Sequence, residues 1–232
     1  MRNTEGLLKV NEHLWHIASE AAAKRPIRST ETVAVVFSAI AIESYVNNLL
    51  ETLSYYVNIG TKMPVRLRIL SAIASGLEVG RAQLPEKVNL ISSVLRGHDF
   101  DKGKNPYQEF DLLLAIRHRF VHSRPSRLKF ADVGSDFSVV GEQKRIRQGL
   151  VDRGLINPAA LKFGWEAVFG GGQTGEWAVQ TAYNMARAIG DCFPKGKWRR
   201  WAQSENPLSR EAQELRERAT PVLPKNDGSA PA

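Results

Sequence analysis

Hydrophobic residues recur three to four positions apart along most of this chain, a spacing that predicts α-helices. The first such pattern ends at Pro26, and a second, longer one runs from Thr30 to about Asn58. A further helix is expected to start at Pro106 and to fray near Ser123, because Pro125 disfavours helical geometry at the residue before it. Shorter helices are expected at 65–74, 85–96, 142–154 and 176–193. The pattern predicts an all-α, antiparallel helical bundle.

One stretch, Leu128 to Val140, does not follow this spacing. Its apolar residues are compatible with a short hairpin or with an irregular flap, inserted after the helix that ends near Ser123. We expect a single domain over residues 1–203, with a core at 31–123 and a C-terminal helical extension at 142–203. Residues 204–232 are polar and contain Pro and Gly, which predicts a largely flexible tail.

Composition narrows the classes of protein that fit this chain. A hydrophobic content of 43% is typical of a globular protein. Because the longest apolar run, Val33 to Ile42, is interrupted by Ser38, we expect no membrane span. The N-terminal residues lack the apolar core of a signal peptide, so the expected location is the cytoplasm. A single cysteine, Cys192, excludes an internal disulfide and zinc sites built from several cysteines.

The charge of the chain favours a polyanionic partner. The formal net charge is +8, and Lys and Arg outnumber Asp and Glu by eleven to seven between Arg96 and Arg147. Such an excess makes nucleic acid a candidate partner, although it can also be spread over a solvated surface. A second basic cluster, Lys195 to Trp201, alternates cations with indoles. It could stack bases, lie on a membrane surface, or be a docked helix end.

Arg117 interrupts an apolar stripe on the helix that follows Pro106. The stripe consists of Phe110, Leu113, Leu114, Arg117, Phe120 and Val121. A buried guanidinium cannot lose its proton, so it needs a carboxylate or an incoming anion. Glu43 and Asn47 interrupt a similar stripe on the long second helix, and we therefore expect an Arg117–Glu43 pair. The pair would be either purely structural or part of a functional site.

Two histidines, His118 and His122, lie one helical turn apart beside Arg117. Zinc would need a third ligand, and Asp111 on the same line lies about 16 Å away along the axis. We therefore predict no metal and no other cofactor. His122 could instead be only a cation that the helix dipole favours near the C-terminal end.

The spacing Arg117-x4-His122 resembles the R-x4-6-H signature of the HEPN superfamily, small all-α domains of which many are ribonucleases. The apolar residues Leu112 to Ile116 before the motif match its usual appearance. The segment Ala39 to Asn47 is similar to the helix that many members pack beside the motif, with an acidic residue at Glu43. The resemblance covers roughly residues 31–123.

The resemblance implies a homodimer that joins two motifs in one basic cleft and cleaves RNA without metal. Arg117 and His122 lie about 140° apart around one helix, so a frayed helix end or a second subunit would have to bring them to one phosphate. His122 would transfer protons, Arg117 would stabilise the transition state, and His118 would assist. Glu43 and Asn47 would support Arg117. Further RNA contacts would come from Arg119, Arg124, Arg127 and Lys129.

Some members of the superfamily pair with a nucleotidyltransferase antitoxin, and others act in phage defence, so the resemblance allows a toxin or a defence effector. Two other classes stay open on the sequence. One is a non-catalytic HEPN-like module that binds RNA or a protein. The other is a helical interaction protein in which the Arg117–Glu43 pair is only structural and, being buried, contributes a few kcal/mol.

Overall fold

The computed structural model describes residues 2–24, 28–79, 82–121, 128–129, 138–139, 142–158 and 173–205. Within these residues the chain forms eight helices: α1 (Arg2–Ala23), α2 (Arg28–Asn58), α3 (Val65–Val79), α4 (Leu84–Arg96), α5 (Tyr107–Val121), α6 (Glu142–Asp152), α7 (Thr174–Cys192) and α8 (Lys197–Ser204). The prediction of an all-α protein is confirmed. Two short strands, β1 (Leu128–Lys129) and β2 (Ser138–Val139), pair antiparallel with Leu128 opposite Val139. This pairing fits the hairpin alternative for the stretch after α5.

Local residues mark the start of α4 and the C-terminal ends of α4 and α6. The carboxylate of Glu86 accepts a hydrogen bond of 2.8 Å from the backbone N–H of Gln83, just before α4. Gly97 follows α4 with φ of 88°, and Gly154 follows α6 with φ of 68°. These left-handed conformations are easy for glycine and strained for other residues. The ends of both helices therefore follow from the sequence.

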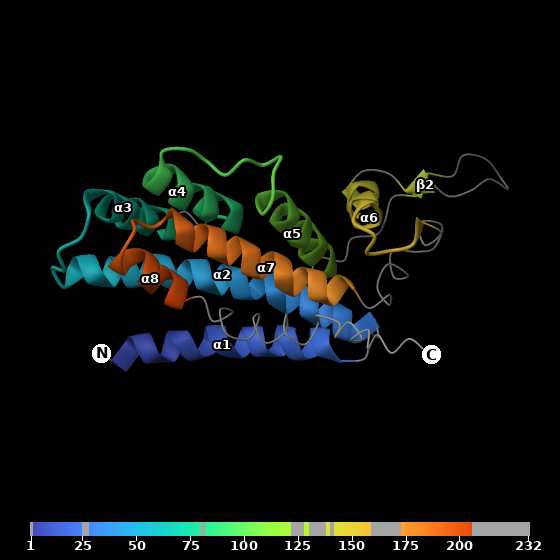
Figure 1. Cartoon of the computed structure of the whole chain (residues 1–232), viewed down its shortest axis with the longest axis horizontal. Helices are drawn as coiled ribbons and strands as arrows, with labels where there is room; N and C mark the ends of the chain where they lie inside the picture. Colours follow the sequence, from blue (N-terminus) through green and yellow to red (C-terminus); the bar gives the residue numbers. More distant parts are fainter. Residues whose placement is uncertain are drawn as a thin grey trace, which may run out of the picture.

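Helix α2 is the centre of the bundle. Helix α1 lies along one of its sides, and α7 lies along another, while α3, α4 and α5 also contact it (Figure 1). Its buried residues accordingly lie on more than one side of the helix, as with Asn48 and Leu50, which are two residues apart and both buried. A helix that is apolar on most sides is typical of such a central position.

Helix α7 packs very closely against the start of α2. A Cβ atom added to Gly175 would lie 3.2 Å from the Cβ of Ala34 and 3.5 Å from the Cα of Ala22 in α1. Only glycine fits at this point without displacing its neighbours. Small buried residues continue along the same helix: Ala178, Ala182 and Ala186. The close approach makes α7 an integral wall of the core.

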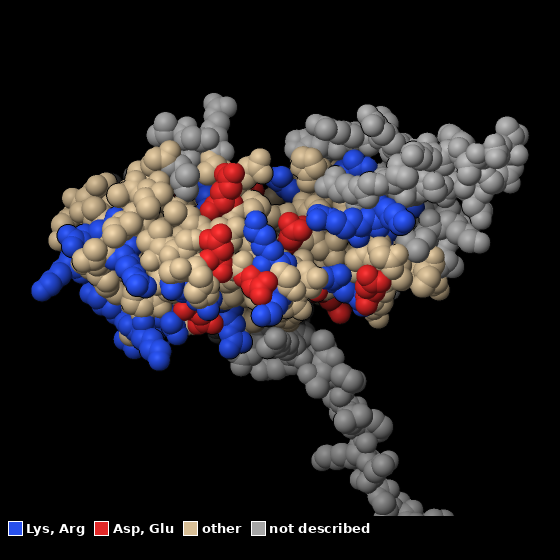
Figure 2. Space-filling view, turned by 90° about the horizontal axis from the view of Figure 1, so that it is seen from above, with Lys and Arg blue, Asp and Glu red and all other residues tan. Residues whose placement is uncertain are grey.

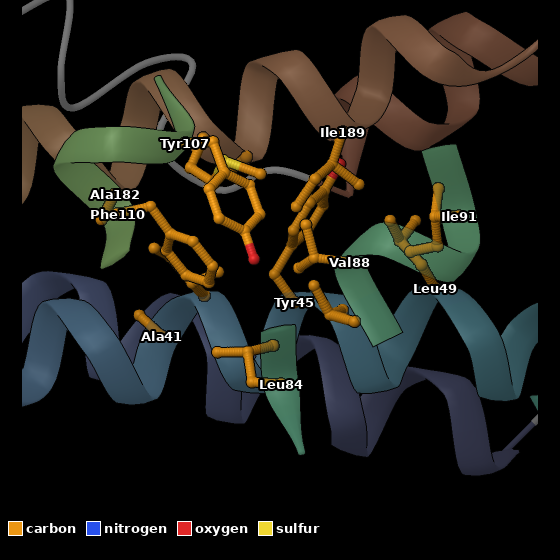
Figure 3. Close-up of a cluster of buried hydrophobic side chains, with 14 of the residues drawn as sticks. Ala41, Tyr45, Leu49, Leu84, Val88, Ile91, Tyr107, Phe110, Ala182 and Ile189 are labelled. Carbon is orange, nitrogen blue, oxygen red and sulfur yellow. The ribbon is translucent and has the colours of Figure 1, made fainter. Parts of the chain in front are cut away.

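Side chains from α2, α4, α5 and α7 meet in the core shown in Figure 3. Phe110 of α5 is fully buried near Ala41 of α2 and Ala182 of α7. Its ring packs edge-on against Tyr107, with centroids 5.8 Å apart. The helix that carries the Arg117 motif is therefore held firmly to the bundle through its first half.

The tryptophan cluster after α7 is a docked helix. Trp198 and Trp201 of α8 each lie 5.9 Å from the ring of Tyr56 in α2, in edge-on geometry. The buried hydroxyl of Tyr45 donates a hydrogen bond of 3.0 Å to the carbonyl oxygen of Ala202. Since Trp198 is buried and Trp201 half-buried, the indoles contribute mainly to packing. This outcome matches the docked-helix alternative.

The end of α8 carries a pH-sensitive contact. The side-chain amide of Asn48 donates a hydrogen bond of 3.0 Å to Glu205, whose pKa is nevertheless raised because burial disfavours its charged form. When a carboxyl group has a higher pKa in the folded than in the unfolded protein, the free energy of unfolding falls as the pH rises through these two pKa values.

We therefore expect Glu205→Gln to stabilise the protein at pH 7 more than at pH 4, because glutamine accepts the same hydrogen bond without charge. Urea unfolding of both proteins at the two pH values measures the difference. If the free energies of unfolding of the wild type and the variant differ by the same amount at both pH values, ionisation of Glu205 does not affect folding.

One helix among the described residues is long and apolar enough to cross a membrane, judged by length and composition. It spans Ser29–Asn58 in α2, and 61% of its most apolar window is buried inside the bundle. A core helix of a soluble protein satisfies the same criterion, so this finding is weak evidence in either direction.

Candidate functional site

Arg117 and Glu43 form the ion pair that the sequence predicts. The Nη2 atom of Arg117 lies 3.8 Å from the Oε2 atom of Glu43, which joins α5 to α2. The side chains are 30% and 46% exposed, so the pair lies at the surface of the bundle. Exposed pairs at this distance contribute about 0–1 kcal/mol, because water screens both charges. Arg117 is therefore restrained by Glu43 but remains open to another anion.

The expected buried stripe of α5 is confirmed only in its first half: Phe110 and Leu113 are buried, but the Arg117 side chain is 30% exposed. Val121, on the same predicted stripe, is 47% exposed, whereas Leu112, Ala115 and Ile116 are buried. The buried face is turned because α5 packs against α6 as well as α2 and α7. A Cβ atom added to Gly149 of α6 would lie 3.2 Å from the side chain of Leu112. Leu112 is thus buried against α6, while Arg117 lies at the edge of the core.

Asn47 does not contact Arg117 as its supporting role would suggest. Its side-chain oxygen accepts a hydrogen bond of 2.9 Å from the ammonium group of Lys87 on α4. Lys87 is only 8% exposed, and the sequence analysis missed it. The signal was available in the sequence, because Lys87 interrupts the buried stripe of Leu84, Val88 and Ile91 on α4. Two neighbouring polar residues of α2 thus bind cations from other helices: Glu43 binds Arg117 of α5, and Asn47 binds Lys87 of α4.

The other predicted site residues are only partly placed. His118 is exposed and Arg119 is half-buried on the last turns of α5, beside Arg117. Lys129 belongs to β1. The principal histidine, His122, and the candidate RNA contacts Arg124 and Arg127 lie outside the described residues.

Charges on the face around α5 are mixed in sign. Lysine and arginine side chains alternate there with aspartate and glutamate, rather than forming one continuous basic patch (Figure 2). Arg145 of α6 lies 3.4 Å from Asp111 of α5, and both side chains are exposed. The positive charge is thus offset locally by carboxylates. To bind a phosphate, an arginine such as Arg117 or Arg145 would have to break its ion pair with a carboxylate.

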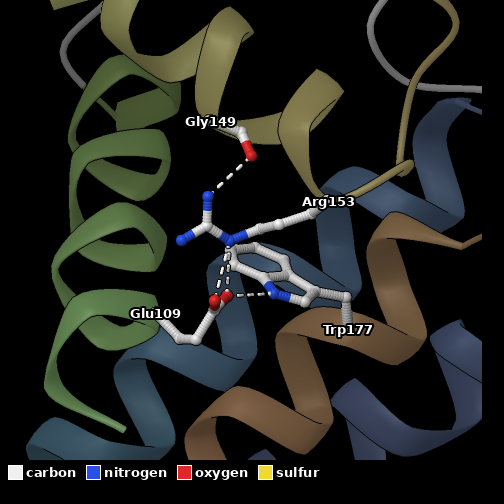
Figure 4. Close-up of polar contacts among 4 residues, drawn as sticks. All are labelled: Glu109, Gly149, Arg153 and Trp177. Atoms are coloured by element: carbon white, nitrogen blue, oxygen red, sulfur yellow. Dashed lines mark hydrogen bonds and ion pairs between the residues drawn. The ribbon is translucent and has the colours of Figure 1, made fainter. Parts of the chain in front are cut away.

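A second polar cluster fixes α5 against α6 and α7 (Figure 4). The Nε atom of Arg153 lies 2.8 Å from each carboxylate oxygen of Glu109, and its Nη1 atom donates to the carbonyl of Gly149 at 2.7 Å. The indole N–H of Trp177 donates to Glu109 at 2.6 Å. Arg153 and Glu109 are only 21% and 19% exposed. Each of the three side chains thus has at least one hydrogen-bond partner within the cluster, which is typical of a structural tie.

No group of three potential metal ligands occurs in the described part of the chain. No family model, curated protein or solved structure matches this chain. The candidate site is therefore defined by its own residues: Arg117 and Glu43, with Asn47 and Lys87 beside them.

Proposed function

We propose that this protein is a metal-independent endoribonuclease of HEPN type, with an HEPN-like bundle as its scaffold. The observation that carries the proposal is the half-exposed Arg117, paired with Glu43 at 3.8 Å in the same chain that places a histidine five residues later. A guanidinium in this position can exchange a weakly held carboxylate for an RNA phosphate. The resemblance of the Arg117-x4-His122 motif to the HEPN signature also supports a ribonuclease function.

In the proposed reaction, the 2′-hydroxyl of RNA attacks the adjacent phosphorus atom. The new O2′–P bond forms as the P–O5′ bond breaks, which leaves a 2′,3′-cyclic phosphate and a free 5′-hydroxyl group. His122 of one subunit takes the proton of the 2′-hydroxyl, and His122 of the second subunit gives one to the leaving oxygen. Arg117 stabilises the charge that develops on the phosphate oxygens. Because DNA lacks the 2′-hydroxyl, it would not react.

The remaining site residues would prepare Arg117 for this step. Glu43 holds the guanidinium near the end of α5 in the absence of RNA. Lys87 and Asn47 would add positive charge and hydrogen-bonding capacity along α2. His118 and Arg119 lie on the same helix end and would contact the RNA backbone, as would Arg124, Arg127 and Lys129. A nucleotidyltransferase antitoxin and a role in phage defence belong to the same proposal.

The test is RNA cleavage by the purified protein in EDTA. We expect fragments with 2′,3′-cyclic phosphate ends, identified by mass spectrometry, and a homodimer by light scattering. The matched control substrate carries a single 2′-deoxynucleotide at the cleaved position and should stay intact. RNA that is bound but never cut would instead identify a non-catalytic binding module, and cleavage that stops in EDTA would contradict the metal-independent mechanism.

A further inference from the structure

An open hollow of about 690 Å³ lies at one end of the bundle. It is formed where the C-terminal ends of α4 and α7 meet the start of α3 and α8, on the left in Figure 1. Its wall includes three arginines from three different helices: Arg66, Arg96 and Arg199. The helices that carry Arg117 and Glu43 contribute no residue to it, so this hollow is separate from the candidate active site.

Positive charge dominates the hollow. In the part of the chain that the structure describes, none of these three guanidiniums has an ion-pair partner. Asp191 is the one carboxylate among the lining residues, and it accepts a hydrogen bond of 3.0 Å from Gln203. Burial raises the pKa of the neighbouring Cys192 thiol, which therefore stays neutral near pH 7. Three positive charges thus face one negative charge.

Two of the arginines are held in position by backbone carbonyl groups. Arg66 donates to the carbonyl of Leu95 at 2.8 Å, and Arg199 donates to those of Phe193 and Asp191 at 3.1 and 2.8 Å. Such bonds cap the ends of α4 and α7, where the helix dipole favours cations. A guanidinium has five N–H donors, so one or two carbonyl contacts leave most of them for a ligand. Fixed arginines bind an anion at a lower entropic cost than free ones.

We propose that this hollow binds a small molecule that carries two or more phosphate groups, with Arg66, Arg96 and Arg199 as the phosphate-binding residues. Arginine is suited to this role because its planar fork matches phosphate oxygens in pairs. The volume lies within the range of small-molecule sites, and a single phosphate would fill only part of it. The apolar lining residues, such as Leu95 and Pro194, would contact the less polar part of the ligand.

The test is isothermal titration calorimetry of the full chain with inorganic tripolyphosphate, ATP and adenosine. We expect both anions to bind and adenosine not to bind. Tighter binding of ATP than of tripolyphosphate would identify a nucleotide as the ligand, and equal binding would identify a polyphosphate group. Absence of binding by both anions at millimolar concentrations would overturn the proposal.

Variants locate the site within the molecule. The Arg96 guanidinium lies 6.0 Å from the centre of the Phe100 ring and beside the Cys192 thiol, and we expect Arg96→Ala to weaken tripolyphosphate binding at least about tenfold, as for loss of a charged hydrogen bond. Arg68→Ala is the matched control, because Arg68 is an exposed arginine of α3 that does not line the hollow. Equal weakening by both variants would indicate nonspecific attraction and contradict the proposal.

A gain-of-binding variant keeps the test independent of folding. Asp191→Asn removes the one negative charge but retains an acceptor for Gln203, so it should bind tripolyphosphate more tightly than the wild type. Affinity equal to or weaker than that of the wild type would count against the site. RNA cleavage should be unchanged in these variants, which separates this proposal from the proposed endoribonuclease function.

Discussion

Alanine at Arg117 or at His122 is expected to lower RNA cleavage at least about a hundredfold, since a general acid–base group typically contributes 10²–10⁴-fold and a charge-stabilising group a similar factor. The measurement is the single-turnover cleavage rate of an RNA oligonucleotide in EDTA. Thermal stability should change little, because the Arg117–Glu43 pair is partly exposed to water and contributes about 1 kcal/mol or less. A large loss of activity in a stable protein would separate a catalytic role from a structural one.

The matched control for Arg117 is Arg145→Ala. Arg145 is also an exposed arginine that pairs with a carboxylate, Asp111, on the same helix as Arg117. Its loss removes the same charge from the neighbouring helix α6, so any loss of activity through general electrostatics should appear in both variants. Wild-type cleavage rates in both Arg117→Ala and His122→Ala would exclude these residues from the reaction.

Glu109→Ala is expected to cause the largest loss of stability among single changes at the surface of α5. It removes the partner of Arg153 and of the Trp177 indole in one step, and both groups are held between α5, α6 and α7. Leaving a largely buried guanidinium and an N–H group unpaired costs about 3 kcal/mol. The free energy of unfolding in urea measures this loss.

The control for this prediction is Asp111→Ala, two residues further along α5. Asp111 forms an ion pair with the exposed Arg145, and both side chains are exposed, so its loss should cost no more than about 1 kcal/mol. If Glu109→Ala and Asp111→Ala destabilise the protein equally, the cluster around Trp177 is not a structural tie. Glu109→Ala should also reduce RNA cleavage if the position of α5 matters for the proposed site.

Sequence periodicity identifies the helices but not the faces that they bury. The predicted bounds of α2 and α4 agree closely with the structure, because Gly60 lies two residues after Asn58 and Gly97 directly follows Arg96. The buried face of α5 differs from the predicted stripe, because α5 packs against α2, α6 and α7 and is hydrogen-bonded to α4 through Tyr107, whereas a helical-wheel argument assumes one neighbour. The same argument underestimated how much of the surface of α2 is buried, because α2 lies between α1 and α7.

The candidate site was predicted in part. The Arg117–Glu43 pair followed from two charged residues that interrupt apolar stripes, since opposite charges near a core favour contact. The partner of Asn47 did not follow, because several polar residues on α3 and α4 could have reached it. The tie between Glu109 and Trp177 gave no sequence signal, since the two residues are 68 positions apart in the chain.

The amino-acid sequence by itself determined the all-α class, the ends of α2 and α4 and the meeting of Arg117 with Glu43. These properties depend on local spacing, on glycine and proline, and on the pairing of opposite charges. Only the tertiary structure decided that Arg117 is half-exposed, that Lys87 bonds Asn47, and that Arg66, Arg96 and Arg199 surround one hollow. Solvent exposure and the convergence of distant side chains depend on how helices pack, and helical periodicity carries no information about which helices become neighbours.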